Sequence, residues 1–299
     1  ASESVLLPST SETAGTATFT GMTFFIPMNT TKPVDVYVDV PTTASGATSG
    51  ASISVSLSSQ QGFKAVDAAG NNDTQLASAD LASTGTSGKG LMIVRKTVPT
   101  LSAVALDSST LSAGSDIIIG RVKVTADAAG DLDWGQVVFT INKSAVVTLG
   151  ATSTVKLWEG ASSIAGSFAT TSGNLLTQTQ MFPVDANMGT GGSLFFRPTA
   201  VRTVPANSSA TYELRTTVGG LASGSNLSVS IANPATAVTT GTFTVVGGTF
   251  GSDTSSFVWT DLSVNTHVPG TTGGSEGDWT DDYLVKTLPL TVGNKSVSF

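Results

Sequence analysis

Apolar residues alternate with polar ones along most of this chain. Between positions 34 and 40, valine takes every second place, and Asp35, Tyr37 and Asp39 lie between the valines. In such an alternation, one set of side chains faces a core and the other set faces water, as in a half-buried β-strand. The same pattern recurs at residues 53–57, 104–106, 117–124, 137–141, 146–149, 155–158, 212–218, 227–231 and 243–246.

Turn-forming residues separate these runs. Clusters of Gly, Pro, Asn, Asp and Ser lie between them, and no segment carries the apolar stripe of a capped helix. The sequence therefore predicts an all-β protein of sandwich architecture with very little helix.

The composition excludes several classes of protein. Charged residues make up only 12% of the 299 residues, against roughly 25% in ordinary domains, and the net charge is −7. Basic residues are scattered singly apart from Arg95 and Lys96, so no positive stripe is available to bind nucleic acid. No apolar run approaches the roughly 20 residues that a membrane-spanning helix needs. The chain has no cysteine, which suits an exported protein and a cytosolic one equally, and it begins at Ala1 without a leader, as expected of a processed or recombinant product.

An internal repeat divides the chain. Residues 26–40 match residues 204–218 at a constant offset of 178, and both copies carry the turn sequence Pro-x-Asn. After a difference of four residues in loop length, residues 49–57 match residues 223–231, and both begin with Ser-Gly. Alternation alone would not reproduce these turn residues, so the sequence predicts two related modules.

The two modules differ in length. Residues 98–250 are predicted to form a complete β-sandwich module, whereas residues 1–97 lack the counterparts of about four strands and form a partial one. A sandwich without these strands leaves open edges and an uncovered core face. Residues 251–299 match neither copy and are apolar enough to be buried, so they are predicted to be a donor strand or a cap.

Two further segments are distinctive. The first comprises Arg121–Asp131, Trp134 and residues 137–140, and the second comprises residues 256–261, His267 and residues 278–289. Both resemble parts of large secreted surface proteins, of surface-layer or filament type, from candidate-phyla bacteria. The resemblance implies tandem immunoglobulin-like sandwich modules, a cell-surface location and a structural role, and it supplies no catalytic residues. The short N-terminal copy departs from it, because such proteins usually have a complete module there.

Residues that carry enzyme or metal chemistry are scarce. The single histidine, His267, has no nucleophile motif beside it, and a chain with one histidine and no cysteine lacks the ligands of a conventional zinc site. Two clusters of carboxylates and amides lack the spacing of a calcium loop and are interpreted as turns. These clusters are Asp127, Asp131 and Asp133, and Asp67, Asn71 and Asp73. The sequence therefore predicts no catalytic, cofactor-binding or metal-binding residues.

One acidic group supports a different interpretation. Asp278, Asp281 and Asp282 flank Trp279 and Tyr283, and a carboxylate pair beside aromatic rings would suit a glycosidase. The tryptophans are candidates for a platform that stacks on sugar rings, although core packing explains them too. They are Trp134, Trp158, Trp259 and Trp279. A secreted carbohydrate-binding or adhesin β-sandwich protein is therefore the alternative function.

The main functional hypothesis is self-assembly. About 50 residues are missing from the first module and about as many follow the second, so a neighbouring subunit is expected to complete the open sandwich by donating a strand head-to-tail. The predicted partner is the chain itself, in an extracellular filament or surface lattice, without nucleic acid, cofactor or membrane span. The predicted self-assembly residues are the acceptors Phe24, Ile26, Val36, Val38, Ile53 and Val55 and the donors Leu284, Leu288, Leu290 and Val292.

Two points stay open. In the competing interpretation, residues 251–299 complete the first sandwich within the same chain or cap the second, and the protein is a monomer. Six Asn-x-Ser/Thr sequences also leave glycan modification open.

Overall fold

The computed structural model divides the chain into two compact units. It describes residues 25–33, 35, 37–53, 65–66, 69–70, 72–73, 92–150, 155–171, 190–235, 240–241, 255–263 and 278–297. The N-terminal unit comprises Ala1–Val40 and Ser54–Gly90, and the C-terminal unit comprises Pro41–Ile53 and Leu91–Phe299.

Strands, turns and loops make up nearly all of the described residues in both units. In the described residues the helical structure is limited to two short 3-10 segments, η1 (Thr43–Ser45) and η2 (Asp282–Leu284). The prediction of an all-β protein with very little helix is therefore confirmed. Within the same residues, no helix is long and apolar enough to span a membrane.

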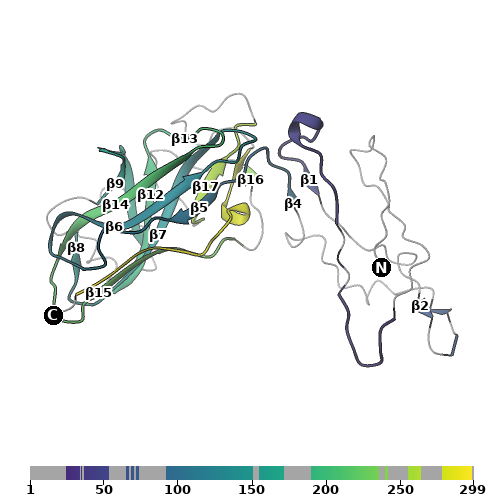
Figure 1. Cartoon of the computed structure of the whole chain (residues 1–299), viewed down its shortest axis with the longest axis horizontal. Helices are drawn as coiled ribbons and strands as arrows, with labels where there is room; N and C mark the ends of the chain where they lie inside the picture. The colour runs from purple at the N-terminus through teal and green to yellow at the C-terminus, as the bar shows by residue number, and fades with distance from the viewer. Residues whose placement is uncertain are drawn as a thin grey trace. The chain divides into compact units, whose positions relative to one another are not determined.

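The first of the two large sheets that the described residues of the C-terminal unit form is centred on β14 (Figure 1). Its strand order is β10-β9-β14-β6-β5, and β8 also pairs with β14. β14 is antiparallel to β6 and also to β9 and β8, so its backbone is hydrogen-bonded along both edges. The strands are β5 (Thr100–Ala103), β6 (Gly114–Thr125), β8 (Thr148–Leu149), β9 (Lys156–Glu159), β10 (Ser162–Ser163) and β14 (Ser209–Gly219).

The second sheet is built around β7 (Leu132–Lys143), which pairs with β12, β13, β15 and β17. Four more strands extend it, with β11 beside β12, β19 beside β15, β18 beside β17 and β16 beside β18. Their bounds are β11 (Gly166–Thr171), β12 (Gly191–Pro198), β13 (Arg202–Val204), β15 (Asn226–Ile231), β16 (Thr240–Gly241), β17 (Phe257–Thr260), β18 (Trp279–Thr280) and β19 (Leu290–Ser296).

The two sheets enclose one apolar core. Alternate residues of β14, including Tyr212 and Leu214, are buried, and those between them are partly exposed, as a period of two predicts. Trp134 of β7 contacts Phe196, Tyr212 and Phe257, with ring centroids 5.1 to 6.3 Å apart. A void of about 10 Å³ among these side chains has room for no more than a water molecule.

Residues beyond position 250 form part of this sandwich. β17 pairs with β7, and β19 pairs antiparallel with β15; Figure 1 shows the yellow C-terminal strand running beside β15. β19 also packs against β5 and β6 of the first sheet. The compact C-terminal unit therefore contains residues from both predicted segments, 98–250 and 251–299.

Shorter pairings lie outside the two sheets. In the N-terminal unit, β2 (Ala65–Val66) pairs with β3 (Asn72–Asp73). In the C-terminal unit, β1 (Ser52–Ile53) pairs with β4 (Met92–Ile93), although the sequence grouped both with the partial module.

One predicted strand is shifted. The sequence places a strand at residues 104–106, whereas the structure has β5 immediately before them, with Leu101 completely buried. The reason is register, because β5 pairs with the end of β6 and this pairing turns Leu101 into the core.

Candidate self-assembly surface

Both copies of the repeat contain the same first turn. Asn29 and Asn207 adopt the left-handed backbone conformation, with φ of 59° and 54°. In each turn the next residue donates its backbone N–H to the proline carbonyl, at 3.2 Å from Thr30 and 3.1 Å from Ser208. Asparagine adopts this conformation more readily than most residues, which explains why both copies carry it. The repeat in the sequence thus has a counterpart in backbone geometry.

The second shared turn matches as well. Gly50 and Gly224 both have positive φ, 86° and 75°. The following residues, Ala51 and Ser225, each donate their backbone N–H to the carbonyl three positions earlier, at 3.2 and 3.0 Å. One turn leads into β1 and the other into β15. The second matched strand therefore begins in the same way in both copies.

The two copies differ in whether their apolar residues are covered. In copy two, Val204 of β13 and Val218 of β14 are 0% and 2% exposed, because both lie in the core that the two sheets enclose. The equivalent residues of copy one, Ile26 and Val40, are 43% and 44% exposed. No strand is formed by residues 25–33, 35 and 37–40, the described part of this segment. One sequence pattern is therefore buried in one copy and open in the other.

We call these described residues of copy one the exposed segment. It presents further large apolar side chains, since Phe25, Met28 and Tyr37 are 74%, 88% and 87% exposed and Val38 is 39% exposed. Exposed apolar residues that occur singly are ordinary, whereas a group of them in one segment marks an interaction surface. The exposed segment is therefore the candidate functional surface.

The predicted acceptor residues have different positions. Ile26 and Val38 lie in the exposed segment. Ile53 lies in β1 of the C-terminal unit instead, where it pairs with Met92 and is partly buried. Phe24, Val36 and Val55 lie outside the described residues.

The predicted donor residues belong to the sandwich of their own C-terminal unit. Val292 is buried in its core, and Leu288 and Leu290 pack against that core. Leu284 lies in η2. A Cβ added at Gly293 would come 1.9 Å from the Ile119 carbonyl oxygen, which shows how closely β19 approaches β6. In this structure β19 therefore lies in the sandwich of the C-terminal unit, paired with β15.

The acidic group near the C-terminus holds backbone segments together. The carboxylate of Asp282 accepts the backbone N–H of Ala235 at 2.8 Å and that of Ser256 at 2.7 Å. A buried carboxylate that accepts two N–H groups joins the segments that carry them. Asp282 therefore connects the loop after β15 to the start of β17.

The other two carboxylates of this group are also engaged. Asp278 accepts the hydroxyl of Thr260 at 2.8 Å, and Asp281 caps η2 by accepting the backbone N–H of Tyr283 at 3.1 Å. Both aspartates are 2% exposed. These contacts give the acidic group a structural role, because each carboxylate holds a backbone or side-chain group of another segment or of the same turn.

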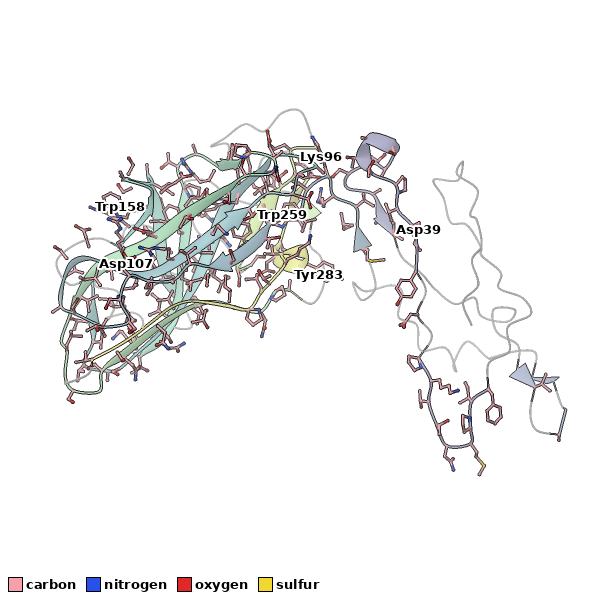
Figure 2. The ribbon with its side chains drawn as sticks, viewed as in Figure 1. Asp39, Lys96, Asp107, Trp158, Trp259 and Tyr283 are labelled. Atoms are coloured by element: carbon pink, nitrogen blue, oxygen red, sulfur yellow. The ribbon has the colours of Figure 1, made fainter. Side chains whose placement is uncertain are left out.

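Three of the four tryptophans lie in the interior. Trp134, Trp259 and Trp279 are at most 3% exposed. Trp158 on β9 is partly exposed, and the guanidinium carbon of Arg215 lies 4.4 Å from its ring centroid. Figure 2 shows Trp158 at the outer side of the sandwich and Trp259 within it. Of the four candidates for a sugar-stacking platform, Trp158 is therefore the one with an accessible ring.

Within the first cluster interpreted as a turn, Asp127 forms a turn hydrogen bond, because it accepts the backbone N–H of Ala129 at 3.1 Å. Asp131 instead accepts the backbone N–H of Ala206 at 2.7 Å and so joins two segments that are distant in the sequence. Asp133 is buried in β7. Among the described residues, no group of three or more His, Cys, Asp or Glu side chains is arranged to hold a metal ion.

The other residues considered for catalytic or metal chemistry lie elsewhere. Asp73 of the second cluster lies in β3. His267, Asp67 and Asn71 lie outside the described residues.

Sequence reasoning missed a buried ion pair. Arg95 Nη1 lies 3.8 Å from Asp261 Oδ1, and both side chains are 0% exposed. Because these residues are 166 positions apart in the chain, no local pattern in the sequence links them.

Comparison with known proteins does not assign the exposed segment to a family. No protein-family model matches the chain, and no curated protein matches it. The function of this surface therefore has to follow from its own residues.

Proposed function

We propose that this protein is the structural subunit of an extracellular bacterial filament or surface lattice, in which copies of the chain assemble head-to-tail. One observation carries the proposal: the apolar positions that copy two buries are open in copy one. Val218 is 2% exposed, and its equivalent Val40 is 44% exposed. A neighbouring subunit that covers the exposed segment would restore to copy one the environment that copy two already has.

Two physical effects favour such a contact. Covering apolar surface contributes roughly 25 cal/mol per Å² removed from water. A strand added along the exposed segment also supplies hydrogen-bond partners to its backbone while alternate side chains enter the new core. Because the contact joins two different surfaces, it repeats from subunit to subunit and produces a fibre or a lattice.

The exposed segment is the acceptor in this proposal. Leu288, Leu290 and Val292 already pack in the core of their own sandwich. They act as donors only when β19 is exchanged between two subunits, which is a form of domain swapping. The identity of the donated strand is therefore a separate question from the identity of the acceptor.

Composition and resemblance support the extracellular setting. A charged fraction of 12% makes the surface hydration depend little on salt, and the absence of cysteine removes one oxidation target. Residues 121–131 and 278–289 resemble secreted bacterial surface proteins. These features suit a passive outer polymer.

Light scattering over about a hundredfold dilution, with electron microscopy of the same samples, tests the proposal. We expect regular multiples or fibres from the wild type and their loss in Val38→Asp and Val40→Asp. Val146→Asp is the matched control, because Val146 is 50% exposed in the C-terminal unit and lies outside the exposed segment. A monomeric wild type, or polymers that survive both exposed-segment variants, would contradict the proposal.

Carbohydrate binding is the second candidate, and Trp158 is the observation that favours it. Its ring is partly exposed and lies close to Arg215 and Lys156, with distances of 4.4 and 6.0 Å from the ring centroid to the guanidinium carbon and the ammonium nitrogen. An aromatic ring beside cations is a surface on which an acidic sugar could stack.

A further inference from the structure

Two short segments of the C-terminal unit form a stem. We define the stem as residues 41–53 and 92–97, which pair through β1 and β4. Gly50 donates its backbone N–H to the carbonyl of Val94, and Val94 donates its N–H to the carbonyl of Ala51, both at 2.8 Å. The chain passes between the two units at the ends of these segments. The stem is therefore the part of the C-terminal unit from which the chain continues into the N-terminal unit.

Asp261 fixes both segments of the stem. Its side chain is completely buried at the end of β17. Oδ2 accepts the hydroxyl of Ser49 from the first segment and the backbone N–H of Lys96 from the second, the latter at 2.7 Å. Oδ1 faces the guanidinium of Arg95 at 3.8 Å. One carboxylate thus joins the two segments to the sandwich.

Other contacts hold only the second segment. Thr97 Oγ1 accepts the backbone N–H of Asp127 at 3.0 Å. Lys96 packs on Gly130, where an added Cβ would come 2.7 Å from Lys96 Cε. The first segment is joined to the rest of the unit through its pairing with β4 and through Ser49.

The ion pair between Arg95 and Asp261 is poorly satisfied. No nitrogen of the Arg95 guanidinium has a hydrogen-bond partner among the described residues, and neither does Asp261 Oδ1. Burial lowers the pKa of Arg95, and the nearby carboxylates of Asp261 and Asp278 oppose that change. Burying a charge without full hydrogen bonding costs free energy that the attraction between the partners offsets only in part. The attachment of the stem is therefore weaker than the sheets to which it is attached.

We propose that Asp261 is a latch: the stem is held while this carboxylate binds Ser49 and Lys96, and it detaches as one unit from a sandwich that stays folded. Such local opening is expected where few backbone hydrogen bonds hold a segment and where the neighbouring core stays folded without that segment. Detachment converts the stem from a fixed part of the C-terminal unit into a tether. The proposal concerns the C-terminal unit and does not depend on self-assembly.

Amide hydrogen exchange of the full chain tests the latch. The amide of Lys96, which donates to Asp261 Oδ2 at 2.7 Å, reports on the latch, and the amide of Val138, which donates to the Ser256 carbonyl at 2.8 Å, reports on the sandwich. In the wild type we expect faster exchange at Lys96 than at Val138. Asp261→Asn should speed exchange at Lys96 by about ten- to a hundredfold, because a neutral acceptor replaces a charged one and the ion pair with Arg95 is lost, and should leave Val138 unchanged.

Asp282→Asn is the matched control. Asp282 is also buried and accepts two backbone N–H groups, but it joins Ala235 and Ser256 and does not touch the stem. We expect this variant to speed exchange at Val138. Ser49→Ala is a milder second variant, which removes one bond of the latch and should speed exchange at Lys96 by less than Asp261→Asn does. Equal acceleration of stem and sandwich in Asp261→Asn, or no acceleration in Asp261→Asn and Ser49→Ala, would overturn the proposal.

Discussion

Trp134 donates its indole N–H to the hydroxyl of Tyr212 over 3.2 Å in the core of the C-terminal unit. The two rings meet edge to face, with their centroids 5.1 Å apart. Burial in this apolar setting raises the pKa of Tyr212 to about 12, from an ordinary value of 10.0. The folded sandwich therefore holds the neutral phenol over a wider pH range than the unfolded chain does.

Alkaline pH should destabilise the sandwich through this tyrosine. The stabilisation is complete below pH 10.0 and is lost as the pH rises to about 12, because in this window the unfolded state gives up a proton that the folded state retains. The expected loss is about 2–3 kcal/mol in the free energy of unfolding. Urea unfolding across this window should show that Tyr212→Phe removes this part of the pH dependence. Identical slopes for the wild type and the variant would contradict the assignment.

The conformation of Asn207 in the shared turn predicts different effects of two substitutions on the free energy of unfolding. Asn207 has a φ of 54°, so Asn207→Gly should leave the free energy of unfolding nearly unchanged, whereas Asn207→Ala should lower it by about 1 kcal/mol. Thermal or urea unfolding of the C-terminal unit measures both. Asn29→Ala is the control, because Asn29 lies in the N-terminal unit and should not change this transition. Equal effects of Gly and Ala at position 207 would count against a strained turn.

The position of β19 in the sandwich predicts how shortening its side chains, or deleting the strand, changes the free energy of unfolding. Val292 is buried in the core, so Val292→Ala should lower the free energy of unfolding of the C-terminal unit by about 1.5–3 kcal/mol. Val40→Ala, at an exposed position, should change it by less than about 0.5 kcal/mol. Deletion of residues 282–299 should unfold the sandwich itself, since it removes β19 and the Asp282 contacts. A neutral Val292→Ala would show that β19 does not close its own module.

Substitutions of Trp279 and Trp158 distinguish an effect on stability from an effect on polysaccharide binding. Trp279→Ala should lower the free energy of unfolding by about 3–5 kcal/mol, because the ring is buried, and Trp158→Ala should lower it by far less. Trp158→Ala is therefore the useful variant for measuring polysaccharide retention. Carbohydrate binding would be favoured if the wild type is retained by the polysaccharide and the folded Trp158→Ala variant is not. Equal retention by both proteins, or none, would count against that function.

Strands with one face in water are the part of the fold that sequence reasoning predicts well. β14 and β15 lie within a few residues of the runs 212–218 and 227–231, because their alternation of apolar and polar residues can be recognised from neighbouring positions alone. β7 is longer than the predicted run 137–141, and it is buried on both faces. Its buried Gln136 breaks the apolar pattern, and the amide binds the Ser255 carbonyl at 2.8 Å and accepts from the buried Arg197. Such a polar contact depends on residues far along the chain.

The candidate site was predicted only in part for the same reason. Periodicity and the repeat identify the residues that could enter a core, including Ile26, Val38 and Val292. They do not state which core each residue enters, and the structure places Val292 with β15 and β6. The acidic group of Asp278 to Asp282 likewise has a composition that suits catalysis. Its structural role depends on where distant N–H groups lie, which the sequence does not specify.

The arrangement of β17 and β19 also fixes the order in which the sandwich can form. β7 and β15 are synthesised first, yet each needs a partner that follows much later, since β17 begins at Phe257 and β19 at Leu290. Pairings between residues so distant in sequence make folding slow, because long loops must close before the contacts stabilise anything. While residues 257–296 are still being made, the first sheet has no complete partner. The second sheet therefore gains its last strand only after residues 290–296 have been synthesised, and until then the edge of β15 that β19 will occupy has no partner strand.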